Sequence, residues 1–412
     1  MNPFEQTPKP IDSMFHNWSN IYPKPYNKNE VDPYTKTRVI LMNGTEYEAV
    51  WFSHQFQRHC PDNDLRRELA LVRRIEQQQQ KVIAALKPVD ETILEHTISY
   101  EQLAVDLTAG IAQCEPDAMV KAALDFALLE DFDHLYRYSD LLEMETGVKA
   151  EQLIGYYTEI MPGRPTISEH RYPFDNIRNF INAKTASPLT KLHVSIITAA
   201  EQQTMNYYMN TSALYHNDLG RQLYQEIGLI EEQHVSQYGS LMDTTTTMLE
   251  CLLMHEYTEC YLYYSCYEDE TDLYIKKIWE QHFEQEVAHL HSAARLLKKY
   301  EGKEWQECIL DGEFPKLLTL HENKDYIRKV LANTVSNTSK LENYVEVSSL
   351  PKTDVFYMFQ NQLNQPVEVV PAHKVIKAYI EKSGTDYRYQ EQEHPIRALQ
   401  DRSMDNTMVG RE

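Results

Sequence analysis

Glycine is scarce in this chain, with 12 residues among 412, and long stretches contain no turn signal. These two features favour helices. The six cysteines include no Cys-x-x-Cys pair, which excludes a zinc ribbon and a rubredoxin-type iron site. No apolar run approaches the roughly 20 residues that a membrane-spanning helix needs. We therefore expect a soluble, mainly helical protein with buried free thiols.

Basic residues are also in deficit, since 40 of them face 62 acidic residues and leave a formal net charge of -22. A charge of this sign repels phosphate backbones and anionic lipid, so neither nucleic acid nor a membrane surface is expected as a partner. The first ten residues contain no basic stretch followed by an apolar core. The absence of such an export signal predicts a cytoplasmic location.

Residues 1–63 differ from the rest of the chain because they are rich in proline and aromatic residues. Two β-prone runs flank the pair Asn43-Gly44, which suits a type I′ turn. The pattern therefore predicts a β-hairpin from Arg38 to Trp51, as a small appendage at the N-terminus.

Residues 64–302 are predicted to form the helical domain. A polar, solvent-facing helix at 64–86 precedes six principal helices between Asp90 and Gly302. The six helices form three hairpins, and a proline-containing crossover at 147–186 separates the first hairpin from the second. Such a chain belongs to the all-α class.

Residues 303–382 give a weaker signal and predict a mixed C-terminal extension. We expect a helix near 323–341, an extended stretch at 354–370 and a helix at 371–382. The tail at 383–412 is polar and is predicted to be mobile.

One arrangement of acidic residues and histidine recurs in the three hairpins. A carboxylate and a histidine lie three positions apart on the second helix, and another carboxylate lies thirty residues before the first of them. The three sets are Glu101 with Asp131 and His134, Glu201 with Glu231 and His234, and Glu256 with Glu286 and His289. Helical neighbours at this spacing project to one side, so an oxygen and an imidazole nitrogen can meet the same ion. Two hairpins supply four carboxylates and two imidazoles, which suits two iron ions, two manganese ions, or one of each.

On these residues the region from Asp90 to Gly302 resembles the ferritin-like superfamily, which includes rubrerythrins, bacterioferritins, manganese catalases and di-iron oxidases. The resemblance implies a four-helix bundle around a buried dinuclear metal site, here enlarged by a third hairpin. Asp131 departs from the family pattern, which has glutamate at this position. Glu130, beside it, is a possible substitute ligand, as is Glu259 in the third hairpin.

Connection lengths favour the first two hairpins as the main site. In ferritin-like bundles the second and third helices are parallel, so their connection must return along the bundle. The crossover at 147–186 can span the required distance of about 40 Å. Residues 242–245 reach only about 17 Å when extended, too short for the equivalent distance of roughly 30 Å after the second hairpin. The predicted main ligands are therefore Glu101, Asp131, His134, Glu201, Glu231 and His234.

The third hairpin allows three interpretations for its possible ligand set of Glu256, Glu286 and His289. Two copies of the hairpin could form a second site across a two-fold dimer. Alternatively, this hairpin could replace the first as partner of the second in a rearranged topology. It could also simply pack against the bundle, with hydrogen bonds satisfying its acids and histidine.

These features predict a dinuclear non-haem oxidoreductase that acts on peroxide or dioxygen. Because the chain lacks a four-cysteine iron site, it would need an external electron donor, whereas a manganese-catalase reaction would need none. We expect a homo-oligomer, most simply a dimer. The alternatives are an iron-binding or storage protein without turnover and a metal-free structural helical protein.

Overall fold

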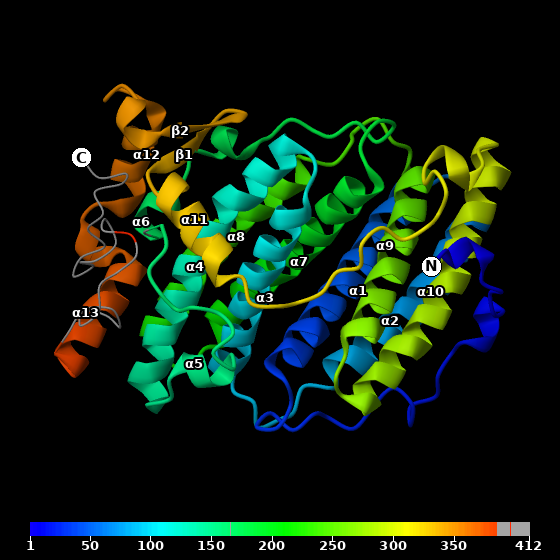
Figure 1. Ribbon diagram of the computed structural model, residues 1–412, viewed down its shortest axis with the longest axis horizontal. Coiled ribbons are helices and arrows are strands. Elements are labelled where there is room, and N and C mark those ends of the chain that lie inside the picture. Colours follow the sequence, from blue (N-terminus) through cyan, green and yellow to red (C-terminus); the bar gives the residue numbers. More distant parts are fainter. Residues whose placement is uncertain (165, 385–395, 397–412) are drawn as a thin grey trace. The chain divides into compact units, whose positions relative to one another are not determined.

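The computed structural model describes residues 1–164, 166–384 and 396. The described chain is mostly helical with one small two-stranded sheet (Figure 1), which confirms the all-α class. It forms two compact units. Unit 1 comprises Met1–Glu91, Phe180–Gln203 and Met242–Leu320, and unit 2 comprises Thr92–Asn179, Thr204–Leu241 and the described residues from His321 onward.

Two helical hairpins form the body of unit 1. The hairpin of residues 33–84 packs against the hairpin of residues 248–301 through both of its helices, and the four helices form a bundle. Its helices are α1 (Pro33–His59), α2 (Asn63–Ala84), α9 (Met248–Asp269) and α10 (Leu273–Glu301), with short 3-10 helices at Pro3–Glu5, Ile11–Ser13 and Trp305–Glu307. Unit 1 also includes the first part of α7 (Pro188–Leu214).

The predicted β-hairpin at 38–51 is wrong, because this segment lies within α1. The side chain of Asp32 accepts a hydrogen bond from the Tyr34 N–H, and Pro33 suits the first turn. Gly44 does not form a turn. A Cβ atom there would lie 2.6 Å from Oε1 of Gln203, so the glycine allows α1 to approach the unit 1 part of α7 closely.

The helix predicted at 64–86 corresponds to α2, but it is not simply solvent-facing. One face buries Leu69, Ile75, Glu76 and Gln79. The boundary predicted after residue 63 falls at the start of α2, inside unit 1. The polar composition of α2 suggested an exposed helix, but its polar residues Glu76 and Gln79 lie on the buried face.

Unit 2 is built around the predicted first hairpin and α8. The helix α4 packs against both α3 and α8. The last part of α7 contacts α8, since a Cβ atom at Gly228 would lie 3.5 Å from Cβ of Tyr208. The helices are α3 (Ile93–Cys114), α4 (Ala118–Thr146) and α8 (Asp218–Gly239), and the crossover contains α5 (Ala150–Leu153), α6 (Thr166–Glu169) and a 3-10 helix at Pro173–Asn176.

Local signals explain where the long helices begin and end. Thr92 forms a capping box at the start of α3, and Thr247 does the same for α9. Gly147 and Gly302 follow α4 and α10 with φ angles of 74° and 69°, the left-handed conformation that glycine adopts without strain. The capping boxes thus fix where α3 and α9 begin, and the two glycines fix where α4 and α10 end.

The C-terminal part of unit 2 mixes helices with the small sheet. The helix α11 packs against α3 and α4, and α13 packs against α4 and α8. The elements are α11 (Lys324–Thr334), antiparallel strands β1 (Asn337–Lys340) and β2 (Asn343–Glu346), a 3-10 helix at Val347–Ser349, α12 (Val355–Asn364), a 3-10 helix at Val367–Val369, and α13 (Pro371–Ser383).

Two predictions for this region need correction or limitation. The extended stretch predicted at 354–370 is wrong, because Asp354 caps α12 and most of the segment is helical. The predicted mobile tail at 383–412 lies outside the described residues except for Ser383, Gly384 and Ile396. Within the described chain, no helix has the length and apolar character needed to cross a membrane.

Candidate metal centres

Unit 2 brings together five of the six predicted main ligands, which we call the unit 2 cluster. All five side chains are buried in the core. They are Glu101 on α3, Asp131 and His134 on α4, and Glu231 and His234 on α8. The sixth predicted ligand, Glu201, is buried on the part of α7 that belongs to unit 1.

Glu231 lies at the centre of this cluster. Its Oε1 is 3.0 Å from Nδ1 of His134, and its Oε2 is 3.0 Å from Nδ1 of His234. Ligand atoms of Asp131, Glu231 and His234 lie within 4.8 Å of one another, as do those of Glu101, His134 and Glu231. Two ligands of one ion lie about 3 Å apart when each bond is about 2.1 Å long and the bonds are perpendicular. These residues could therefore hold metal on both sides of Glu231.

Both histidines are anchored through the other nitrogen of the ring. Nε2 of His134 lies 3.0 Å from Oε2 of Glu169, and Nε2 of His234 lies 2.7 Å from Oε2 of Glu130. Metal-binding histidines commonly donate their second N–H to a carboxylate, which fixes the tautomer and the ring orientation. The arrangement leaves the two Nδ1 atoms directed toward Glu231.

Glu130 was predicted as a possible substitute ligand, but the structure places it at Nε2 of His234, whereas Glu231 lies at Nδ1. Its Oε1 lies 2.9 Å from a guanidinium nitrogen of Arg164 and also accepts a hydrogen bond from Arg171. Burial opposes ionisation of Glu130, yet Arg171, the hydrogen bond with His234 and Arg164 together lower its pKa. Glu130 therefore orients a histidine and neutralises arginines, while Asp131 contacts the cluster.

The unit 2 cluster contains its own positive partners. Burial disfavours the charged form of Glu231, but hydrogen bonds with His134 and His234 lower its pKa to about 2. Burial would lower the pKa of His134, but Glu169 and Glu231 raise it well above its usual value. Burial raises the pKa of Glu101 well above its usual range, although His134 opposes this shift. Interactions between residues of the same unit thus stabilise the charged forms of Glu231 and His134.

Two acceptor atoms of the unit 2 cluster are left over. Oε1 of Glu101 accepts a hydrogen bond from the hydroxyl of Tyr208, whereas Oε2 of Glu101 and Oδ2 of Asp131 have no hydrogen-bond partner among the described residues. Buried polar atoms without partners are costly. A cation in each of the two ligand groups that share Glu231 would satisfy one of these atoms, so this donor set fits metal.

The third hairpin joins a different partner from those considered for it. In unit 1, its Glu256, Glu259, Glu286 and His289 meet α1 and α2 of the same chain, which contribute Glu46 and Glu76. All six residues are buried, and we call them the unit 1 cluster. In this chain α1 and α2 thus supply the acids that face the third hairpin.

An offset of fifty-five residues relates the two clusters and would have revealed the missing half. Glu46, Glu76 and Gln79 precede Glu101, Asp131 and His134 by this offset, and Glu201, Glu231 and His234 precede Glu256, Glu286 and His289 by the same offset. Tyr208 and Tyr263 also differ by fifty-five positions, and they donate hydrogen bonds to Glu101 and Glu46 respectively. Gln79 in the histidine position obscured the fourth copy, as did the turn signal at Asn43-Gly44.

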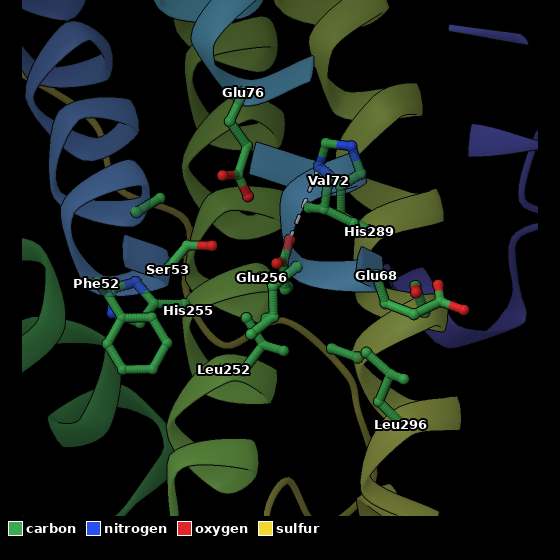
Figure 2. A pocket seen from close by; sticks show the side chains of 14 residues that line it. Phe52, Ser53, Glu68, Val72, Glu76, Leu252, His255, Glu256, His289 and Leu296 are labelled. Atoms are coloured by element: carbon green, nitrogen blue, oxygen red, sulfur yellow. Dashed lines mark ion pairs between the residues drawn. The ribbon is translucent and has the colours of Figure 1, made fainter. Parts of the chain in front are cut away.

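Figure 2 shows Glu76, Glu256 and His289 converging from α2, α9 and α10. One ligand atom from each lies within 4.8 Å of the others, and Glu256, Glu259 and Glu286 form a second such group. Nδ1 of His289 is 3.1 Å from Oε2 of Glu286 and 3.8 Å from Oε2 of Glu256. These residues could also hold a metal ion, with Glu259 within the cluster.

Carboxyl groups greatly outnumber positive partners in the unit 1 cluster. Burial raises the pKa of Glu76 to about 7, an effect that Glu286 strengthens and His289 opposes. Burial and neighbouring carboxylates raise the pKa values of Glu256 and Glu259 well above their usual range. Several of its buried atoms have no hydrogen-bond partner among the described residues: Glu46 Oε2, Glu76 Oε2, Glu256 Oε2, both carboxylate oxygens of Glu259, and His289 Nε2.

A small pocket borders this cluster. Its lining includes Phe52, Ser53, Glu68, Leu252 and Leu296 together with the three converging residues shown in Figure 2. Glu76, Glu256 and His289 therefore border a space of about the size of one water molecule.

Comparison with known proteins assigns no family. No protein-family model, curated protein or solved structure matches this chain. Functional inference therefore rests on the geometry and charge of the two clusters.

Proposed function

We propose that this chain is a dinuclear non-haem metal oxidoreductase. The unit 2 cluster would hold two iron ions, two manganese ions, or one of each, and peroxide or dioxygen would be its substrate. The observation that carries this proposal is the position of Glu231, whose two oxygens face the Nδ1 atoms of His134 and His234. Glu231 and the two imidazoles would hold the ions, and Glu101 and Asp131 would supply further carboxylate oxygens.

The ligand types support iron or manganese over structural zinc. The unit 2 cluster offers carboxylate oxygens and imidazole nitrogens without a thiolate, and all six cysteines are free. Structural zinc sites favour thiolates in closed tetrahedra, whereas oxygen-rich sets with imidazole suit iron and manganese. When bound, such ions would supply Lewis-acid and redox chemistry to an O–O bond.

The residues of the chain would position the ions and exclude water. Glu130 and Glu169 hold the imidazole rings in orientation, and Glu101 is held by Tyr208. Complete burial keeps bulk water from the ligands. Electrons for a reductive reaction would come from an external donor, while a catalase-type reaction would require none.

The helices that carry these ligands support a ferritin-like arrangement. Glu101 on one helix, Asp131-x-x-His134 on the next and Glu231-x-x-His234 on α8 follow the pattern of di-iron carboxylate bundles. The α1–α2 and α9–α10 hairpins of unit 1 would be a second bundle of this kind. Its cluster would also hold metal, because a divalent cation would neutralise acids that share a single histidine.

Metal analysis of matched variants tests the two assignments separately. The full-length protein would be loaded anaerobically with Fe²⁺ or Mn²⁺, freed of excess metal, and analysed for metal content and particle size. We expect His234→Ala to lose the metal of unit 2 and His289→Ala to lose that of unit 1. His216→Ala is the control, because its exposed side chain lies outside both clusters.

Other outcomes distinguish the alternatives. Failure of the wild-type protein to retain metal would support a metal-free structural role, and hundreds of iron ions per particle would support storage. Peroxide consumption by the loaded protein, measured with and without a reductant, tests turnover. Absence of turnover with peroxide and with dioxygen would contradict the oxidoreductase assignment.

A further inference from the structure

A second pocket in unit 1 is lined by α7, α9 and three other segments, at 181–184, 242–246 and 307–308. Its apolar lining includes Ile181, Val194, Met242 and Met254. His255 lines this pocket and also the pocket that contains Glu76, Glu256 and His289. The same histidine therefore borders both the apolar pocket and the small pocket beside the unit 1 cluster.

The position of His255 is well defined. Its Nε2 is 3.1 Å from Oε2 of Glu48, and its ring centroid is 4.5 Å from that of Phe52. Both partners belong to α1. Glu48 and Phe52 thus hold the side chain of His255, which lines both pockets.

The acidic side chains that line the apolar pocket already have partners. Asp243 accepts hydrogen bonds from the Ala183 and Thr245 N–H groups. Glu250 caps α9 and forms an ion pair with Lys303.

Glu307, the remaining acid in this lining, accepts a hydrogen bond from the Glu304 N–H. The three acids thus serve local structure, and they do not mark the pocket as a binding site for a cation.

Lys191 differs from these acids because its ammonium group has donors to spare. It is half-buried and donates one hydrogen bond, 3.0 Å long, to the carbonyl oxygen of Cys308. An ammonium group has three donors. Burial lowers the pKa of Lys191, although Cys308 and Asp243 oppose this shift, so a bound anion would favour its charged form.

We propose that this pocket binds a small amphipathic carboxylate. The carboxylate group contacts Lys191, and the apolar part lies along Val194, Met242 and Met254 in the direction of His255. Lys191 and Val194 lie three residues apart on α7, so their side chains project to the same side of the helix. Binding at this site requires no metal in either cluster.

Calorimetric titration with octanoate tests the proposal on the full-length protein as purified. We expect saturable binding of one octanoate per chain, weaker binding of octanol and none of octylammonium. Lys191→Met should weaken octanoate binding by about tenfold or more, because it removes a charge-assisted hydrogen bond. Lys191→Arg should retain binding, and Lys277→Met, at an exposed position on α10, should match the wild type.

A second variant keeps the test decisive if Lys191→Met affects folding. Val194→Trp should block octanoate by filling the apolar part of the pocket, while circular dichroism confirms an unchanged helical content. The proposal is overturned if octanoate fails to bind, if octylammonium binds equally well, or if well-folded Lys191→Met and Val194→Trp bind as the wild type does.

Discussion

The two clusters use corresponding positions but differ in how the chain balances their charges. In unit 2, two histidines face Glu231, and Arg164 and Arg171 neutralise the outer carboxylate of Glu130. In unit 1, glutamine replaces one histidine, and five glutamates share His289. The same helical framework thus supports one cluster with internal counter-charges and another with an excess of acid.

This difference separates two ways of tolerating buried carboxylates. In unit 2, hydrogen-bonded cationic partners let Glu231 and Glu130 remain ionised. In unit 1, burial and mutual repulsion favour protonated Glu256 and Glu259 in the absence of a cation. Unit 2 should therefore keep its side-chain arrangement without metal, whereas the charge state of unit 1 should depend on metal.

The largest effect is expected for Glu130→Gln. Removing this buried charge leaves Arg164, Arg171 and His234 without their common partner. Loss of one member of a buried ion pair typically costs about 3–5 kcal/mol. Denaturant unfolding of the metal-free protein, followed by circular dichroism, measures the loss of stability. All four tryptophans lie in unit 1, so their fluorescence provides the control transition; an unchanged circular-dichroism transition would contradict the role of Glu130.

A smaller effect is expected from the pH dependence of His282 in unit 1. Burial, with a contribution from His16, lowers its pKa to about 3 from the usual 6.5. Its neutral form stabilises the fold above pH 6.5, and this contribution is lost as the pH falls toward 3. Lowering the pH from about 7 to about 5 should cost about 2 kcal/mol through this residue.

Tryptophan-detected unfolding of wild type and His282→Leu at these two pH values measures that contribution. The variant should lose less stability on acidification, and an equal loss in both proteins would exclude His282 as the cause. His134 in unit 2 has the opposite sign because its pKa is raised. Its contribution is complete below its unfolded pKa and is lost as the pH rises through its folded pKa.

The matched tyrosines should have smaller and similar effects. Tyr208 donates to Glu101 in unit 2, and Tyr263 donates to Glu46 in unit 1. Changing either to phenylalanine should lower the unfolding free energy by about 1 kcal/mol, the net contribution of a typical hydrogen bond. Hydrogen exchange of α3 and α1 measures the local effect in each unit, and a change in only one would contradict the correspondence.

The smallest effect on metal-free stability is expected for Glu259→Gln. Both carboxylate oxygens of Glu259 lack hydrogen-bond partners among the described residues, and surrounding carboxylates repel its charged form. We expect a change within about 1 kcal/mol, together with weaker metal retention by unit 1. Tryptophan-detected unfolding and metal analysis measure the two effects. A loss as large as that of Glu130→Gln would show that Glu259 has a structural partner comparable to the arginines of unit 2.

The sequence predicted residues whose role follows from helical spacing. Asp131 and His134 share one face of α4, and Glu231 and His234 share one face of α8, so their convergence followed from i, i+3 geometry. Glu169 could not be found in this way, because it lies on a short helix in the crossover and reaches His134 only through the tertiary fold.

Glu46 and Glu76 of the unit 1 cluster were not predicted from the sequence for a different reason. Glu46 lies in a segment whose Asn43-Gly44 pair matches a hairpin turn, but Gly44 serves close helix packing against Gln203. Glu76 is followed at the third position by Gln79 and not by histidine. Local signals therefore indicated the wrong structure, while the long-range offset contained the information needed to identify both glutamates.

The order of the hairpins along the chain affects how the protein assembles during synthesis. The α1–α2 hairpin emerges from the ribosome first, but its partners α9 and α10 follow only after α3, α4 and α8 of unit 2. Closing this long loop adds little entropic cost over a shorter one, yet distant contacts form slowly. The acids of α1 and α2 that are buried in the folded protein therefore remain exposed to solvent during synthesis, while unit 2 begins to fold.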